Sequence, residues 1–430
     1  TFADIVIAIS LIRPGPIIAG TVHAYFRRLL GQEPVTYLHP SLKDALADSL
    51  GTLLWQEQVA LVAHALAGFT LGEGEQMRRS LGKKYAGSEI ERWEAKFIAG
   101  AAARGVSDEI AHKVFEQIKA FGSYAFPRAH AAAFAVLVYQ SAWLKCYYPA
   151  DYAVACLNNM PVGFWGPNVV VSDARRRGIE ILPVSINRSG AKCTVENGGI
   201  RLGFNYVTTL GDTGAAKIVE SRGNKPFVDL IDFYKRTRLP ESQIENLIIC
   251  GAMEEWKVPR RELLWRLGTV AAQVNQLGLV FEEELVDLPP LTQAEKLQAE
   301  LSVLGFSPDD HVMAHYRDWL TKKGVTTSKQ LKHCKDGQKV RIAGISMVLQ
   351  RPPTAKGFAF LTIQDEFFTE KDALYMMDII ISPKVYDTHH RIVRKLLLAI
   401  DGRVQKRGNI INIIAERIYD LQERANASPV

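Results

Sequence analysis

The sequence has few cysteines, and their spacing excludes a disulfide framework or a cysteine-rich metal site. The five cysteines are scattered over 430 residues and none occurs as Cys-x-x-Cys, so we expect most of them to be small buried apolar residues. No run of about 18 apolar residues occurs, so no membrane partner is expected. A basic-then-apolar leader is also missing, and the chain begins with Thr1. We therefore expect a piece of a longer cytoplasmic protein.

Side-chain arrangements that carry catalysis by themselves are missing as well. Two-metal phosphoryl transfer needs paired carboxylates fixed on a rigid sheet, and no Asp-x-Asp occurs on any predicted strand. Asp309-Asp310 fits the first turn of a helix, and Asp365-Glu366 follows a predicted strand at its loop. We find no Ser-His-Asp or Cys-His arrangement and no P-loop. The sequence therefore predicts no catalytic residue and no metal ligand in this chain.

The composition is that of an ordinary globular protein, and its charge permits a nucleic-acid partner without requiring one. Hydrophobic residues make up 47% and charged residues 23%, and the formal net charge is +6. Length alone suggests about three domains. Local clustering of the positive charge matters more than its sum.

The residue patterns change along the chain, and they predict a mainly α, multidomain fold that ends in a β-barrel. The predicted segments are 1–160, helical; 161–207, a mixed connector; 208–268, short helices with Gly-containing turns; 269–336, a linker and helical spacer; 337–421, a β domain; and 422–430, a tail.

The last hundred residues contain five β-rich runs with one helix-like stretch, Pro383 to Lys395, between the third and the fourth. The runs are Val340–Leu349, Phe358–Ile363, Tyr375–Ile381, Leu396–Ile400 and Ile410–Ala415. Five strands with a helix in that position are typical of an OB-fold.

Basic residues cluster in the helical third. Arg13 precedes the rigid turn Pro14-Gly15-Pro16, and the run 78–84 contains Arg78, Arg79, Lys83 and Lys84. Arg128 and His130 lead into an Ala-rich helix. Polyphosphate recognition uses arginine forks and lysine point charges at this density. The alternatives are a solvated helix face for the basic run and a structural role for His130.

Five short segments of this region, in the same order, resemble the fingers of bacterial replicative DNA polymerase alpha subunits, the C-family polymerases. They are Arg13-Pro14-Gly15-Pro16, Trp55-Gln56-Glu57-Gln58, the segment Gln76 to Lys84, His130 to Ala135, and Tyr139 to Lys145. That family shows RPGP, YQEQ, LRRAMGKK, SHSAAYA and YQTAYLK. The resemblance extends over nearly the whole chain and is weakest at Phe367–Ala373, where the loop is longer.

The resemblance implies that a deoxynucleoside triphosphate is the substrate and that the chain binds it. The nucleotide-binding residues would be Arg13, Arg78, Arg79, Lys83, Lys84 and Arg128, with His130 near the sugar. Mg²⁺ would be held by palm aspartates outside this chain, so the chain alone should not polymerise. Three positions depart from the family: Ala129 replaces a serine, and Trp55 and Phe134 replace tyrosines.

The connector resembles the error-prone branch of the family. Gly163-Phe164-Trp165-Gly166-Pro167, Asp173 to Gly178 and Pro183 to Ser189 are similar to the branch pattern GFYSP…DARRHG…PVDVNRS. This implies an error-prone polymerase that acts in DNA replication, DNA repair or translesion synthesis after DNA damage. An alternative for Arg175-Arg176-Arg177 is a solubilising helix end.

Two further regions are expected to bind DNA. The turn from Gly211 to Gly214, with Lys217, resembles a helix-hairpin-helix, and Arg260 and Arg261 follow the second half of a tandem pair. In the OB-fold, the expected DNA-binding cations are Arg341, Arg351 and Lys356, which suit single-stranded template. Phe358 and Phe360 share one strand face, and we expect them to fill the barrel core.

The linker carries Gln276-Leu277-Gly278-Leu279-Val280-Phe281, which resembles the QxxLxF peptide that polymerases dock on a sliding clamp. Gln276, Leu279 and Phe281 would bind the clamp. The other implied partners are primer–template DNA and the remainder of the polymerase, namely its palm, thumb and PHP domain. Two alternatives stay open: a stand-alone, non-enzymatic DNA-binding module built from the hairpin and OB units, and a nucleotide-binding regulatory protein. Both leave the five finger segments unexplained.

Overall fold

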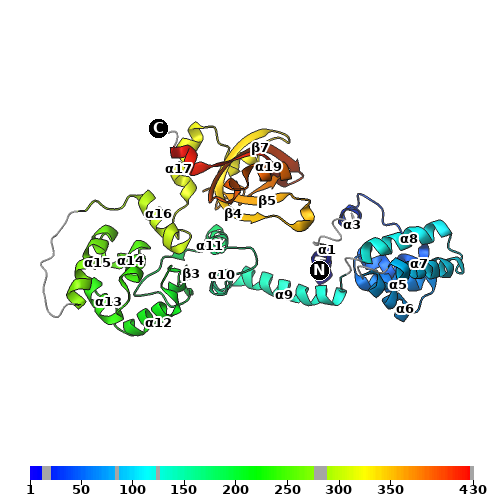
Figure 1. Cartoon of the computed structure of the whole chain (residues 1–430), viewed down its shortest axis with the longest axis horizontal. Coiled ribbons are helices and arrows are strands. Elements are labelled where there is room, and N and C mark those ends of the chain that lie inside the picture. Colours follow the sequence, from blue (N-terminus) through cyan, green and yellow to red (C-terminus); the bar gives the residue numbers. More distant parts are fainter. Residues whose placement is uncertain (12–20, 83–86, 123–125, 276–287, 427–430) are drawn as a thin grey trace. The chain divides into compact units, whose positions relative to one another are not determined.

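The computed structural model describes residues 1–11, 21–82, 87–122, 126–275 and 288–426. Contacts divide the chain into two compact units, Thr1–Cys146 and Tyr147–Val430, and each is described by itself (Figure 1). Among the described residues, no helix is both long and apolar enough to cross a bilayer.

The first unit is helical, as expected. Its helices are α1 (Phe2–Leu11), α3 (Thr21–Leu29), α4 (Lys43–Leu46), α5 (Gln56–Ala67), α6 (Leu71–Leu81), α7 (Gly87–Ala102), α8 (Asp108–Gly122) and α9 (Arg128–Tyr147). Helices α5 to α8 enclose one hydrophobic core, which contains Val62, Met77, Phe97 and Phe115. A second core joins α1 to Trp55 and the start of α9.

Close helix packing in this unit depends on two glycines. A Cβ built on Gly74 of α6 would lie 2.8 Å from the Cα of Ala60 in α5, and one built on Gly100 of α7 would lie 2.2 Å from the carbonyl oxygen of Ala67. Thr70 starts α6 with a capping box, in which its backbone N–H donates to Glu73 at 2.8 Å. The cap and the close crossings together fix where α6 begins and how it lies on α5.

The second unit begins with a mixed region of helices and short strands. Its elements are α10 (Pro149–Asn158), α11 (Pro167–Arg176), β1 (Ile181–Leu182), β2 (Thr194–Glu196), β3 (Gly199–Arg201), α12 (Gly211–Arg222), α13 (Leu230–Thr237), α14 (Glu241–Ile249), α15 (Arg260–Asn275) and α16 (Gln293–Leu304). One hydrophobic core runs from Ala150 to Phe306. The expected boundaries at 207/208 and 268/269 therefore pass through a shared core.

Residues 339–420 form a closed barrel with the strand order of an OB-fold, which confirms the expected fold class (Figure 1). The elements are β4 (Lys339–Gln350), β5 (Ala359–Gln364), β6 (Met377–Ile381), α19 (Pro383–His389), β7 (Leu397–Arg407) and β8 (Ile410–Asp420). The order is β4-β5-β6-β8-β7. Within the barrel, β6 and β8 pair in parallel, while β4 closes the barrel against β7. Strand β7 continues past the expected Ile400 to Arg407, and β8 continues past the expected Ala415 to Asp420, because the two strands pair along nearly their whole length.

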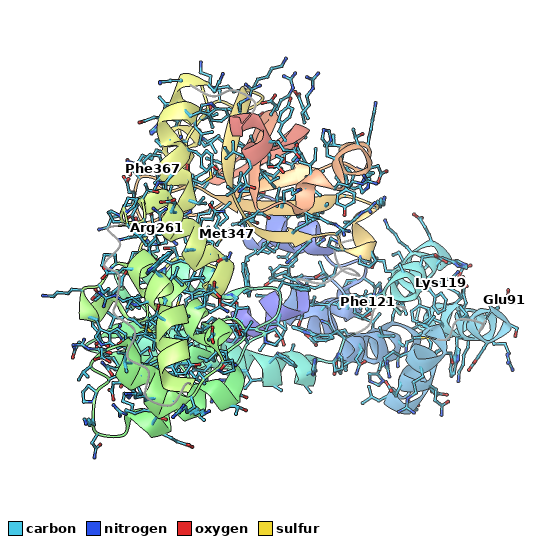
Figure 2. All side chains as sticks on the ribbon, turned by 60° about the vertical axis from the view of Figure 1, so that its left-hand side comes forward. Glu91, Lys119, Phe121, Arg261, Met347 and Phe367 are labelled. Atoms are coloured by element: carbon cyan, nitrogen blue, oxygen red, sulfur yellow. The ribbon has the colours of Figure 1, made fainter. Side chains whose placement is uncertain are left out.

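Helix α11 contacts the barrel through side chains. Ser172 donates to Gln364 at 3.1 Å, and the guanidinium of Arg176 lies 4.6 Å from the ring centroid of Tyr375. Arg175 donates to the carbonyl of Asp309 at 3.1 Å and lies over Phe368. Two residues labelled in Figure 2 lie next to this contact. Met347 accepts a hydrogen bond from the side chain of Asn168, and the ring of Phe367 lies under Arg317 of α17 (Val312–Lys322). Arg175 and Arg176 therefore bind the barrel rather than ending a solvated helix.

The crossing at Gly100 gives a stability prediction. Gly100→Ala should lower the free energy of unfolding by about 1–3 kcal/mol, because the added methyl group meets a backbone carbonyl that no side-chain rotation can move. The control is Gly72→Ala in α6, where the added Cβ meets only Thr70 Oγ1 at 4.0 Å. We expect this control to be neutral or stabilising. Urea unfolding of both variants measures the difference, and equal stabilities would contradict the assigned close contact.

Candidate nucleotide and nucleic-acid interface

The segment Trp55 to Gln58 holds the helices of the first unit together. Gln58 is buried, and its side-chain oxygen accepts from the backbone N–H groups of Leu54 and Trp55 at 2.8 and 3.0 Å. Its amide nitrogen donates to Ser49 Oγ at 2.7 Å. The indole N–H of Trp55 donates to Ser10 Oγ at 2.9 Å. At the position where the family has a tyrosine hydroxyl, Trp55 thus keeps a polar partner.

Glu57 of the same segment caps the N-terminus of α9. Its carboxylate oxygens accept from the backbone N–H of Arg128 at 3.1 and 3.2 Å, and a negative charge at a helix N-terminus is stabilising. The side chain of Arg128 donates to Asp48 at 2.8 Å and lies 4.6 Å from the ring centroid of Trp55. The family resemblance identified this segment, but it did not predict that Glu57 caps a helix.

In α6, one carboxylate holds two of the expected nucleotide-binding arginines. Arg78 donates to Glu75 through Nε and Nη2, both at 2.7 Å, and Arg79 donates to Glu75 through Nε at 2.9 Å. The Arg78 side chain is 19% exposed and that of Arg79 is 71% exposed. The hydrogen bond from Arg78, followed by that from Arg79, lowers the pKa of Glu75 to about 2. The carboxylate therefore stays ionised at neutral pH.

Glu57 caps α9 and also acts on Arg78 of α6 through its negative charge. The hydrogen bond to Glu75 raises the pKa of Arg78, and the negative charge of Glu57 raises it further. His130 is exposed on α9 between two rings, with centroid separations of 5.1 Å to Phe126 and 4.6 Å to Phe134. Arg13, Lys83 and Lys84 lie outside the described residues. Glu75 thus holds Arg78 and Arg79, and Glu57 holds the first turn of α9.

The turn at the start of α12 is exposed, and side chains of α14 hold the backbone that leads into it. Gly211 is exposed with a φ of +61°, a conformation that favours glycine. Side-chain amides of Gln243 and Asn246 donate to the carbonyls of Thr209 and Thr208, both at 3.0 Å. A Cβ on Gly214, the second glycine of the turn, would lie 2.7 Å from the side chain of Leu210.

The three cations expected beside this turn have different surroundings. Lys217 is exposed, and its ammonium group donates to the carbonyl of Arg238 at 3.0 Å. Arg261, labelled in Figure 2, pairs with Glu295 at 2.6 Å. Arg260 is only 7% exposed and pairs with Glu254 and Glu300, at 2.6 and 3.1 Å. The expectation that Arg260 contacts DNA is therefore corrected: its guanidinium is enclosed by the protein and joins α15 to α16.

In the barrel, the expected cations also differ in what surrounds them. Arg341 makes a two-pronged pair with Asp401, at 2.5 and 2.9 Å, which engages its charge within the barrel. Arg351 lies 4.3 Å from the ring centroid of Tyr386 and 3.8 Å from Asp387. Lys356 is exposed at a turn.

The expectation that Phe358 and Phe360 fill the barrel core is wrong. They are 38% and 41% exposed, and the buried positions of β5 belong to Ala359, Leu361 and Ile363. Strand pairing places Phe360 opposite Ile380 of β6, and Ile380 opposite Ile414 of β8, which is 39% exposed. An outward apolar row thus crosses three strands of the barrel.

The expected clamp-binding residues Gln276, Leu279 and Phe281 lie outside the described residues. Within the described part of the chain, no group of three or more His, Cys, Asp or Glu side chains is arranged to hold a metal ion. The Mg²⁺ implied by the family resemblance therefore has no set of ligands among the described residues.

Two known families match the regions that contain these residues. Residues 1–105 match the family described as the bacterial DNA polymerase III alpha subunit finger domain, and residues 178–263 match the helix-hairpin-helix motif. The first match contains Glu57, Glu75, Arg78 and Arg79. The second contains the turn at Gly211 and most of the helices packed behind it.

Curated relatives match along nearly the whole chain. Error-prone DNA polymerase 2 of Rhizobium meliloti is 36% identical, over 98% of this chain and 40% of its own length. Error-prone DNA polymerases of Corynebacterium glutamicum and Mycolicibacterium paratuberculosis are each 37% identical, over 98% and 97% of this chain and 39% and 38% of theirs. The chain thus spans about two fifths of the length of these relatives. It belongs to the bacterial C-family DNA polymerases, the DNA polymerase III alpha-subunit family, and within them to the error-prone branch.

Proposed function

We propose that this chain is the part of an error-prone DNA-directed DNA polymerase that binds the incoming deoxynucleoside triphosphate and the primer–template DNA, in replication or translesion synthesis. The observation that carries the proposal is the arginine pair of α6, held on Glu75 within the region that matches the finger domain. Nucleotidyl transfer itself, with its Mg²⁺ and carboxylates, belongs to another part of the parent protein.

Phosphate binding is assigned to Arg78 and Arg79 of α6. Arginine forks bind phosphate oxygens through charge-assisted hydrogen bonds, which are about twice as strong as neutral ones. Arg79 is exposed and can meet a ligand directly, while Arg78 is held more deeply in the helix bundle. Arg13, Lys83, Lys84 and Arg128 are proposed to complete the phosphate contacts. His130, placed between two aromatic rings, is proposed to lie against the sugar.

Primer–template DNA is assigned to two places in the second unit. At the start of α12, the exposed residues Gly211 to Thr213 offer backbone N–H groups to a phosphate, and Lys217 supplies positive charge. Arg261 of α15 is the cation proposed for the second half of the tandem pair. On the barrel, Phe358 and Phe360 offer ring faces to unpaired template bases, with Arg351 and Lys356 in the adjoining loop. Arg260 is left out of this set, and Arg341 contributes less because Asp401 pairs with it.

The remaining partners follow from the same proposal. The segment Gln276 to Phe281 is proposed to bind a sliding clamp, on the strength of its sequence alone. Palm, thumb and PHP domains of the parent polymerase are proposed as intramolecular partners, and the cytoplasm is the expected location. A stand-alone DNA-binding module would leave the finger-domain match over residues 1–105 without an explanation.

The arginine pair gives the direct test of nucleotide binding. In the longer polymerase that carries this chain, replacing both Arg78 and Arg79 with Ala should raise the KM for deoxynucleoside triphosphate by about tenfold or more, because at least one charge-assisted hydrogen bond is lost. Steady-state primer extension measures KM and kcat separately. Lys113→Ala, which removes an exposed cation of α8, is the matched control and should leave KM unchanged. A double variant with the KM of the unmodified enzyme would remove the proposed role.

The exposed phenylalanines give a test on the chain by itself. Replacing both Phe358 and Phe360 with Ala should weaken binding of an oligothymidylate by about 1–3 kcal/mol for each base that loses its stacking partner. The melting temperature should also fall, because each side chain is only 38% or 41% exposed and the substitutions remove buried apolar area. Fluorescence anisotropy measures the affinity. Ile410→Ala, at an exposed apolar position of β8, is the control. Equal affinities of all three proteins would argue against single-strand binding on this face.

A further inference from the structure

We propose that Glu75 is a positioning residue, whose carboxylate holds Arg78 and Arg79 together as one donor group for a triphosphate. The inference rests on the proposed function of α6 in nucleotide binding and adds a residue to it. Glu75 is an acid in a basic segment, so composition alone would class it as a neutralising charge. The structure assigns it a more specific task.

The positions of these residues on the helix make the arrangement possible. Arg78 and Arg79 follow Glu75 by three and four residues, and both spacings place side chains next to one another on a helix. Oε1 of Glu75 accepts from both arginines, at 2.7 Å from Nη2 of Arg78 and at 2.9 Å from Nε of Arg79. Oε2 accepts from Nε of Arg78 at 2.7 Å. One carboxylate therefore determines the orientation of two guanidinium groups.

This arrangement opposes the natural tendency of the two side chains to separate. Neighbouring arginines repel each other, and each side chain loses rotamer freedom when it is fixed on a ligand. A carboxylate between them offsets the repulsion and orders both side chains before the ligand arrives. Preordering of this kind strengthens binding, because less freedom remains to be lost.

The bonds to Glu75 leave donors for the ligand. Glu75 holds Arg79 through Nε alone, so it does not engage the terminal nitrogens of this exposed side chain. A guanidinium carries five N–H donors and can bind a carboxylate on one edge and a phosphate on another. We therefore expect Glu75 to remain in place when a triphosphate binds, not to be displaced by it.

The experiment uses the longer polymerase and the substitution Glu75→Gln, which keeps the size of the side chain and removes its charge. KM for deoxynucleoside triphosphate should rise by about fivefold or more, with kcat within about twofold, because the loss affects substrate binding alone. Glu91→Gln is the matched control at an exposed acid of α7, labelled in Figure 2. It should change neither constant. A lower KM in Glu75→Gln would mean that Glu75 competes with the phosphate, and would overturn the inference.

A second background separates a positioning role from a general structural one. When Arg78 and Arg79 are both Ala, adding Glu75→Gln should cause no further rise in KM, because there is nothing left to position. An equal rise in both backgrounds would show that Glu75 acts elsewhere, and would overturn the inference while the proposed nucleotide site stands. If the double arginine variant itself keeps a normal KM, the proposed function fails, and the role of Glu75 fails with it.

A third variant keeps the inference testable if Glu75→Gln does not fold. Glu75→Asp keeps the charge on a shorter side chain and can still reach an arginine three residues ahead. Its KM should lie between those of the unmodified enzyme and Glu75→Gln. If Glu75→Asp folds normally and raises KM as much as Glu75→Gln does, the charge is not what orders the arginines, and the inference is contradicted.

Discussion

An arginine that leaves water must keep hydrogen-bond acceptors around its charge, and the way these acceptors are arranged decides which cations of the chain remain available to a ligand. Arg260 is enclosed between Glu254 and Glu300 and joins two helices. At the other extreme, Arg79 is largely exposed and touches its carboxylate through one nitrogen only. Ion pairs with glutamate thus connect two helices at Arg260, while at Arg79 they order a side chain that stays accessible.

Glu57 and Gln58, in the family motif that begins at Trp55, hold backbone groups of the first unit. Gln58 satisfies backbone groups before α5, and Glu57 caps α9, so both residues fix the parts of the unit that carry cations. Glu57 also acts electrostatically on Arg78. The segment is therefore a scaffold for α9, the helix that carries Arg128 and His130.

Sequence patterns predicted five strands of an OB-fold, the helix between the third and fourth strands, and the helical character of the first unit. They failed where the outcome depends on a partner distant in sequence. Alternation shows that Phe358 and Phe360 share a face of β5, but the opposite face, with Ala359 and Leu361, is equally apolar, and only the closed barrel decides which is buried. Likewise, Arg260 is adjacent to Arg261 in sequence, yet Arg260 is the one that meets the half-buried Glu300, forty residues away.

The central claim is that the arginines of α6 bind the phosphates of an incoming nucleotide. A crystal structure of the longer polymerase with primer–template DNA and a non-hydrolysable deoxynucleoside triphosphate would test it most directly. The account predicts guanidinium nitrogens of Arg78 or Arg79 within hydrogen-bond distance of phosphate oxygens, about 2.7–3.2 Å, with Glu75 still bound to both side chains. A triphosphate bound elsewhere, with α6 facing only solvent, would contradict it.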